Sequence, residues 1–130
     1  MTMNEMPVPD ARSALSQDFA HDDDATLALA ADFFHSLSDV SRLRILRHLL
    51  TGPHRVVDLT EHLGLAQSTV SKHLACLRDC GLVTSHPEGR ATVWELIAPD
   101  DLLALLAATD QVLSHSGAQM AVCPTFRSVL

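Results

Sequence analysis

The amino-acid sequence predicts a mainly α-helical domain that carries one β-hairpin, an α+β fold class. Apolar residues recur at spacings of three and four over five segments, which is the pattern of amphipathic helices. Two β-prone runs flank a short segment that contains Pro and Gly, which is typical of a hairpin. The chain has 130 residues and a single Trp, so it can bury only a small core. A second subunit would help to cover its apolar surface.

The two ends of the chain are predicted to lie outside this domain, which we place at residues 24–116. Residues 1–23 lack both a basic start and a continuous apolar run, so we expect a flexible tail rather than a secretory signal or membrane anchor. Residues 117–130 are predicted to form a second tail. On these grounds we expect a cytoplasmic protein that has no membrane partner.

Two helices are predicted first, over residues 25–37 and 40–50. The pair Ser38-Asp39 can cap the second helix, because a short polar side chain accepts hydrogen bonds from the first backbone N–H groups. Thr51-Gly52-Pro53 then ends it. The apolar stripe of this second helix comprises Leu43, Leu46, Leu49 and Leu50.

A third and a fourth helix are predicted over residues 56–63 and 67–80. Gly64 suits the left-handed conformation that terminates helices, and the fourth helix begins only three residues later. Two short helices joined by a tight Gly-containing turn form a helix-turn-helix. The positions of the fourth helix that should face the core are Val70, Leu74, Leu77 and Gly81.

Polar side chains occupy the exposed part of the amino-terminal half of this fourth helix. Hydroxyl and amide groups there can reach base edges or phosphate oxygens of double-stranded DNA, and Lys72 adds a positive charge. A solvated helix start would have a similar composition. The candidate DNA contacts on the helix are Gln67, Ser68, Thr69, Ser71, Lys72 and His73.

A β-hairpin is predicted after the fourth helix. Residues 82–84 and 91–96 are β-prone, and residues 86–90 between them read as a turn. A helix-turn-helix followed by a hairpin is a winged helix. Arg90 at the hairpin tip is placed to contact a phosphate or the minor groove, although an isolated tip Arg is often only solvated.

The last predicted helix, over residues 99–115, has more apolar surface than so small a domain can cover. We assign the excess to a homodimer interface. The apolar residues concerned are Leu102, Leu103, Leu105, Leu106 and Val112.

The formal net charge of −7 argues against nucleic acid only until it is divided by region. Residues 41–90 contain seven Lys and Arg against four Asp and Glu, which leaves a surplus of +3. The acidic residues gather toward the two ends of the chain. A mildly basic centre can face phosphates, although an ordinary mixed surface fits the same numbers.

Three stretches together resemble one known family: LSDVSRLRILRHLL, DLTEHLGLAQSTVSKHLACLRDCGLV and EGRATVWEL. They are similar to the ArsR/SmtB family of metal-responsive winged-helix repressors, over roughly residues 25–115. The resemblance implies a homodimer, built on the first and last helices, that binds an imperfect palindrome without metal and releases it when metal binds. Many arsenic and cadmium sensors of the family carry Cys-x-Cys before an Asp-Leu pair. Here Arg55-Val56-Val57 precedes Asp58-Leu59, so that site is missing.

Two cysteines, Cys76 and Cys80, lie four residues apart on the fourth helix, so both sulfurs can reach one ion. The spacing also fits cysteines that merely pack as small apolar residues. Two thiolates leave a soft ion undercoordinated, and the remaining cysteine is Cys123. Residues 71–83 are similar to the cadmium- and lead-sensing members of the family, which add a cysteine from the C-terminal region of the partner subunit. The resemblance therefore implies a metal site of Cys76, Cys80 and Cys123.

Three thiolates favour Cd(II) or Pb(II) as the inducer. Zn(II) is possible, but it would require a fourth ligand, from His73 or from the run His21-Asp22-Asp23-Asp24. A second family site on the last helix is not expected, because Asp110-Gln111-Val112 lacks the required His and only His115 follows.

A different function remains open for the same cysteines. In a thiol-based redox regulator of the same fold, they would form a disulfide or a sulfenate instead of binding metal. An enzyme is not expected, because the sequence contains no Gly-rich phosphate loop, nucleophile elbow or His-Glu-x-x-His pattern.

Overall fold

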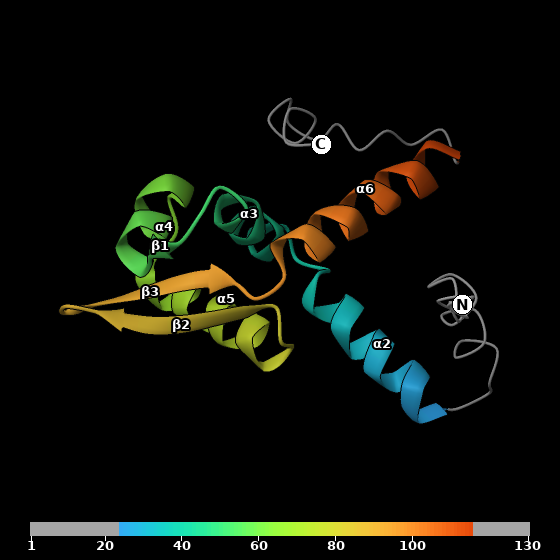
Figure 1. Cartoon of the computed structure of the whole chain (residues 1–130), viewed down its shortest axis with the longest axis horizontal. Coiled ribbons are helices and arrows are strands. Elements are labelled where there is room, and N and C mark those ends of the chain that lie inside the picture. The colour runs from blue at the N-terminus through green and yellow to red at the C-terminus, as the bar shows by residue number, and fades with distance from the viewer. Residues whose placement is uncertain (1–23, 116–130) are drawn as a thin grey trace, which may run out of the picture. The chain divides into compact units, whose positions relative to one another are not determined.

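A computed structural model describes residues 24–115 and shows helices around one small sheet (Figure 1). The chain divides into two units, of which the first ends at His35 and the second begins at Ser36. The predicted winged helix-turn-helix, mainly α with a β-hairpin, is confirmed. The elements in chain order are α2 (Asp24–Ser36), α3 (Val40–Leu49), β1 (His54–Arg55), α4 (Val56–Leu63), α5 (Gln67–Asp79), β2 (Val83–Glu88), β3 (Ala91–Leu96) and α6 (Pro99–His115).

Helix α2 supplies the described part of the first unit. Asp24 lies in its first turn and His35 in its last, the polarity that the helix dipole favours. The rings of Phe33 and Phe34 meet edge to face, with centroids 5.6 Å apart. Leu29 and Phe34 are 72% and 55% exposed, so this helix carries apolar surface that a partner could cover.

The core of the second unit is built mainly by one face of each helix. The spacing predicted for α5 is confirmed at Val70, Leu74 and Leu77, which are fully buried. Gly81 was expected to face the core, but it is exposed and adopts a left-handed φ of 76°. It lies beyond the last turn of α5, where it reverses the chain. The other buried members of the core cluster are Ile45, Leu46, Leu49, Leu59, Val83, Trp94, Leu96, Leu102 and Leu106.

The apolar stripe predicted for α3 is correct at Leu46 and Leu49 and wrong at Leu43, which is 37% exposed. Ile45 takes the buried position instead and has no exposed surface. Leu50 is half-buried and packs at the edge of the core. The helix is rotated toward Ile45 because it must cover α4, α5 and β3 together, which a stripe read from one helix alone does not include.

The ends of the helices follow from local chemistry. Asp39 caps α3 by accepting a hydrogen bond of 3.0 Å from the backbone N–H of Arg42, as predicted. Gly64 ends α4 at φ 65° and ψ 26°, and its N–H donates to the carbonyl of Thr60 at 2.9 Å. Predicted and observed helix bounds agree to within one residue at each end. None of the helices within residues 24–115 is long and apolar enough to cross a membrane.

The sheet is antiparallel with the strand order β1-β3-β2, so β3 is the central strand. The predicted turn over residues 86–90 is too long, because β2 continues to Glu88 and only Gly89 and Arg90 connect the strands. Pro87 is tolerated inside β2 because this is an edge strand, whose outer side needs no backbone donor. Strand β1 was not predicted, since two residues are too short to show an alternating pattern.

Candidate nucleic-acid interface and thiol site

Helix α5 is held by its apolar face against α3 and α4, which leaves the opposite face outward. The left-handed Gly64 lets the chain turn sharply, so that α5 begins close to the end of α4. The N-cap residue Ala66 has no side-chain oxygen, so the first backbone N–H groups of α5 are not capped by it. Such N–H groups are available to a phosphate.

The predicted DNA contacts on α5 are placed in two ways. Gln67, Ser68, Ser71 and Lys72 are exposed, and Thr69 is half-buried. Among residues 24–115, Lys72 has no ion-pair partner, so its ammonium group need not leave a partner in order to bind phosphate. The structure therefore brings a compact polar surface together at the amino-terminal half of α5.

His73 is oriented differently from the rest of this set. Its side chain is only 16% exposed, and its Nε2 lies 3.9 Å from Oδ1 of Asp39, the N-cap of α3. The pKa of Asp39 is held below its usual value, chiefly by the backbone N–H of Arg42 and also by His73. His73 thus connects the candidate DNA-reading helix to α3. Its role in base contact stays a prediction.

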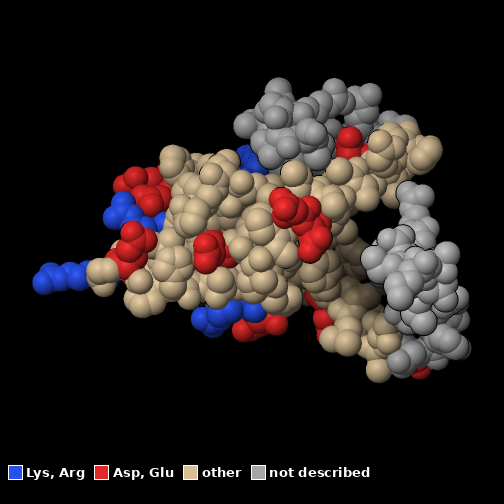
Figure 2. All heavy atoms as spheres, viewed as in Figure 1, with Lys and Arg blue, Asp and Glu red and all other residues tan. Residues whose placement is uncertain are grey.

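The hairpin presents Arg90 at its connecting turn, where the side chain is exposed. Figure 2 shows a basic side chain projecting alone from this tip of the molecule. Arg90 is the single Lys or Arg of β2, β3 and their connection, so it is the wing residue that can reach a phosphate or a groove.

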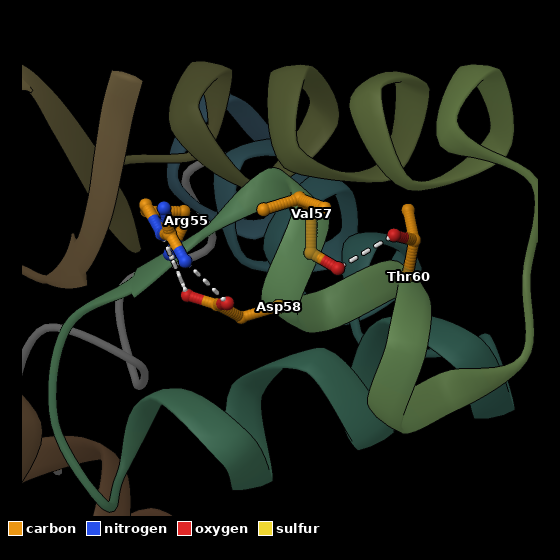
Figure 3. A network of polar contacts seen from close by, with 4 residues as sticks. All are labelled: Arg55, Val57, Asp58 and Thr60. Carbon is orange, nitrogen blue, oxygen red and sulfur yellow. Dashed lines mark hydrogen bonds and ion pairs between the residues drawn. The ribbon is translucent and has the colours of Figure 1, made fainter. Parts of the chain in front are cut away.

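A bidentate ion pair closes the start of α4, at the position where related sensors carry cysteines. Nη2 and Nε of Arg55 donate to Oδ1 and Oδ2 of Asp58 at 3.1 and 3.2 Å (Figure 3). The backbone N–H of Arg55 also donates to Asp58, while Thr60 Oγ1 donates to the carbonyl of Val57 at 2.7 Å. The Arg55 guanidinium holds the pKa of Asp58 below its usual value. This segment stabilises a helix start and offers no thiolate.

Cys76 and Cys80 lie one turn apart at the carboxyl-terminal end of α5. The backbone N–H of Cys80 donates to the carbonyl of Cys76 at 3.2 Å, so the chain is helical between them. Both are half-buried free thiols. The predicted pair therefore shares one helix end. The third predicted ligand, Cys123, lies outside the described residues, as do His21, Asp22 and Asp23.

Within residues 24–115, no three His, Cys, Asp or Glu side chains are arranged to hold a metal ion. A thiolate site that includes Cys76 and Cys80 therefore requires at least one ligand from beyond this range or from another subunit. The sequence reasoning missed one group of residues, His48, His54 and His62, whose rings meet in the structure. Their spacing along the chain carries no signal of this.

Comparison with known proteins decides the family. Residues 39–85 match the family described as bacterial regulatory protein, arsR family. The regulator NmtR of Mycobacterium tuberculosis is 39% identical over 94 residues, which cover 72% of this chain and 75% of NmtR. The chain belongs to the arsR family.

Two other relatives of this arsR-family chain match over shorter stretches. CmtR of Mycobacterium tuberculosis is 49% identical over 61 residues, covering 47% of this chain and 52% of CmtR. The probable mercury resistance operon repressor of Streptomyces lividans is 42% identical over 60 residues, covering 46% of this chain and 48% of that repressor. The chain spans about half the length of these two relatives.

Solved structures share the fold of the arsR-family chain. The crystal structure of Rv0081 of Mycobacterium tuberculosis has a TM-score of 0.66 and 33% identity, covering 72% of this chain and 94% of Rv0081. The homodimeric winged helix-turn-helix domain of Mb0332 from Mycobacterium bovis has a TM-score of 0.58 and 26% identity, covering 86% of this chain and 93% of that domain. The family consists of regulatory proteins, so this chain is a regulator and not an enzyme.

Proposed function

We propose that this chain is a homodimeric, metal-responsive transcriptional repressor of the cytoplasm. In this proposal the metal-free dimer binds operator DNA through α5 and the wing, and Cd(II) or Pb(II) releases it. The observation that carries the proposal is the position of two free thiols on the same helix as the exposed polar surface. The sensor and the DNA reader are then parts of one rigid element.

The DNA-binding half of the proposal rests on exposure and charge. Gln67, Ser68 and Ser71 offer amide and hydroxyl groups to base edges, and Lys72 offers a charge to a phosphate. Arg90 adds a second basic contact from the wing. Because phosphate contacts position a protein and base contacts specify the sequence, the two kinds of residue have separable effects.

The metal-binding half rests on the chemistry of the thiols. Cys76 and Cys80 would hold a soft ion together with Cys123, and three thiolates suit Cd(II) or Pb(II) better than harder metals. Zn(II) is accommodated only if a fourth ligand joins them. The names of the mercury resistance repressor and of CmtR, a relative over the segment that contains both cysteines, support a thiophilic inducer.

Exposed apolar side chains support a dimer. On α6, Val112 is 69% exposed, and on α2, Leu29 is 72% exposed. Surfaces of this kind are usually covered by a partner, and a second copy of the chain is the partner that the homodimeric Mb0332 domain suggests. If Cys123 comes from the second copy, metal binding ties the end of α5 to the other subunit. That constraint opposes the orientation of α5 that DNA requires.

The coupling need not be large. A coupling free energy of about 1–3 kcal/mol between the metal and operator sites weakens DNA binding by about 5–150-fold. The two sites are distinct, since the polar surface lies at the amino-terminal half of α5 and the thiols lie at its carboxyl-terminal end. Tilting or stiffening the helix is sufficient to affect both.

The test uses an operator duplex selected by the metal-free full-length protein from a randomised DNA pool. Its affinity is measured by fluorescence anisotropy at fixed salt, with and without Cd(II), Pb(II), Zn(II) or Ni(II). We expect Cd(II) and Pb(II) to release the duplex and Ni(II) to have little effect. Failure to select any duplex would contradict the DNA-binding half of the proposal.

Cysteine variants separate the metal site from its alternatives. Cys123→Ser should keep metal-free operator affinity and lose most of the Cd(II)-driven release, and the thiolate-to-Cd(II) absorption should fall. Cys76→Ser and Cys80→Ser should lose the response as well. Full absorption and full release in Cys123→Ser would refute the three-sulfur site. Release by peroxide but not by Cd(II) would instead establish the thiol-based redox regulator.

A further inference from the structure

Three histidine rings from three different elements meet in the second unit. His48 belongs to the last turn of α3, His54 to β1 and His62 to the last turn of α4. The ring centroids of His48 and His62 are 5.3 Å apart, and those of His54 lie 6.1 Å from His48 and 6.2 Å from His62. Together these residues form the histidine cluster.

The rings are fixed by contacts that favour their neutral forms. His54 Nδ1 lies 2.7 Å from the carbonyl oxygen of Gly52, and because a carbonyl only accepts, this nitrogen carries the proton. The rings of His48 and His62 are stacked, with 22° between their planes. Stacking of this kind is comfortable for neutral imidazoles, whereas two imidazolium ions at the same distance repel each other.

The charges around the cluster increase this repulsion. The ionisable groups that act on His48 are His62, His54 and Arg47, and together with burial they lower its pKa. No carboxylate within residues 24–115 acts on His48, although α4, α5 and β3 all pack against α3. Asp58 acts on His54, but its carboxylate is already bonded to Arg55.

The cluster lies where the winged-helix elements join. His54 is paired with Trp94 of β3, the central strand of the wing, and α4 packs against both α3 and α5. Separating the three rings therefore loosens the attachment of α4 and of the wing to α3. Because the described residues do not arrange these rings to hold a metal ion, we attribute their proximity to proton coupling.

We propose that the histidine cluster makes the winged-helix unit proton-sensitive, so that protonation in mildly acidic solution opens the junction of α3, β1 and α4. The folded state then binds fewer protons than the unfolded state. Its stability is complete above the ordinary histidine pKa of 6.5 and is lost as the pH falls below it. The stability effect is independent of the proposed function, whereas its effect on operator binding rests on that function.

The test measures urea unfolding of the full chain from pH 7.5 to pH 5.0 in the presence of a chelator. Trp94 is the single Trp, is buried and neighbours His54 across the sheet, so its fluorescence reports on this junction. We expect the unfolding equilibrium constant to rise on acidification by on the order of tenfold for each unit by which the cluster lowers a histidine pKa. The substitutions His48→Gln and His62→Gln should each flatten this dependence.

His86→Gln is the matched control, because His86 Nδ1 lies 3.7 Å from a carboxylate oxygen of Glu95 and outside the cluster. It should leave the acid destabilisation in place. The slope with pH is compared rather than the absolute stability, so a general weakening by substitution does not confuse the result. Histidine NMR titrations that show three independent groups with ordinary pKa values would overturn the proposal. So would a pH dependence that disappears in chelator, which would indicate a bound metal.

Operator affinity supplies a second measurement. The wild-type protein should lose affinity for the selected duplex between pH 7.5 and pH 5.5 more steeply than the His48→Gln/His62→Gln double variant. An unchanged stability curve refutes the proton-sensitive cluster whatever the DNA result. A pH-dependent stability without DNA binding at any pH refutes the proposed function and leaves the cluster supported.

Discussion

Removing a single phosphate contact from α5 or from the wing should change the salt dependence of operator binding by a fixed amount. Lys72 and Arg90 are both exposed, and neither has an ion-pair partner among residues 24–115. Each is therefore ready to replace counterions on DNA. Every phosphate contact contributes about 0.9 to the slope of log affinity against log salt concentration.

The expected magnitude follows from the two copies in the proposed dimer. Lys72→Ala removes one contact from each copy, so the slope should become shallower by about 1.8. Between 50 and 200 mM salt, one contact corresponds to a change in affinity of about 3.5-fold, and two contacts to about 12-fold. Arg90→Ala should have a similar effect, and the double variant about twice that effect if both residues contact phosphates.

The assay is fluorescence anisotropy with the selected duplex at several salt concentrations. Arg78→Ala is the control, because it removes one positive charge from the other end of α5, where the guanidinium lies 5.9 Å from the centroid of the Trp94 ring. Its slope should match that of the wild-type protein. Unchanged slopes for Lys72→Ala and Arg90→Ala, or an equal change for Arg78→Ala, would refute the assignment of phosphate contacts to these two residues.

Three other predictions concern the turn, the cap and base reading. Gly64→Ala should lower the free energy of unfolding by about 1 kcal/mol, because the left-handed φ of 65° disfavours a Cβ. Gly64→Asn should cost less, and equal denaturation midpoints for the two variants would contradict this reasoning. The pKa of Asp39 is lowered from 3.8, so its ionised cap stabilises the fold above that pH and is lost as the pH falls below it. Asp39→Asn should flatten acid unfolding in that range, and an unchanged curve would count against the cap. Ser71→Ala should alter preference among duplex variants if this residue reads a base, whereas uniform weakening across variants would indicate backbone contact.

The positions of the helices could be predicted from the sequence because their causes are local. Apolar spacing locates α5 and its buried residues Leu74 and Leu77, and the capping chemistry of Asp39 and Gly64 marks where helices begin and end. Each of these signals acts within a few residues of the chain. The same holds for the two cysteines, whose spacing of four residues on a helix is sufficient to place them one turn apart.

The tertiary structure alone decided which distant side chains meet. Strand β1 exists because β3 offers it a pairing edge, and Pro87 remains in β2 because that strand lies at the edge of the sheet. His73 is turned toward Asp39 because α5 packs against α3, although its place in the helix suggested a DNA-facing residue. Packing between elements has no fixed period in the sequence, and therefore no pattern in the chain announced these contacts.

The histidine cluster shows this difference most clearly. His48, His54 and His62 are separated by six and eight residues and lie in three elements, so neither helical nor strand periodicity relates them. Their rings come within about 6 Å only because α3, β1 and α4 pack around one corner of the core. The sequence by itself determined the family-like helices, the wing and the thiol pair, since these depend on local spacing. The shared environment of the three imidazoles arises from long-range packing, which only the folded chain contains.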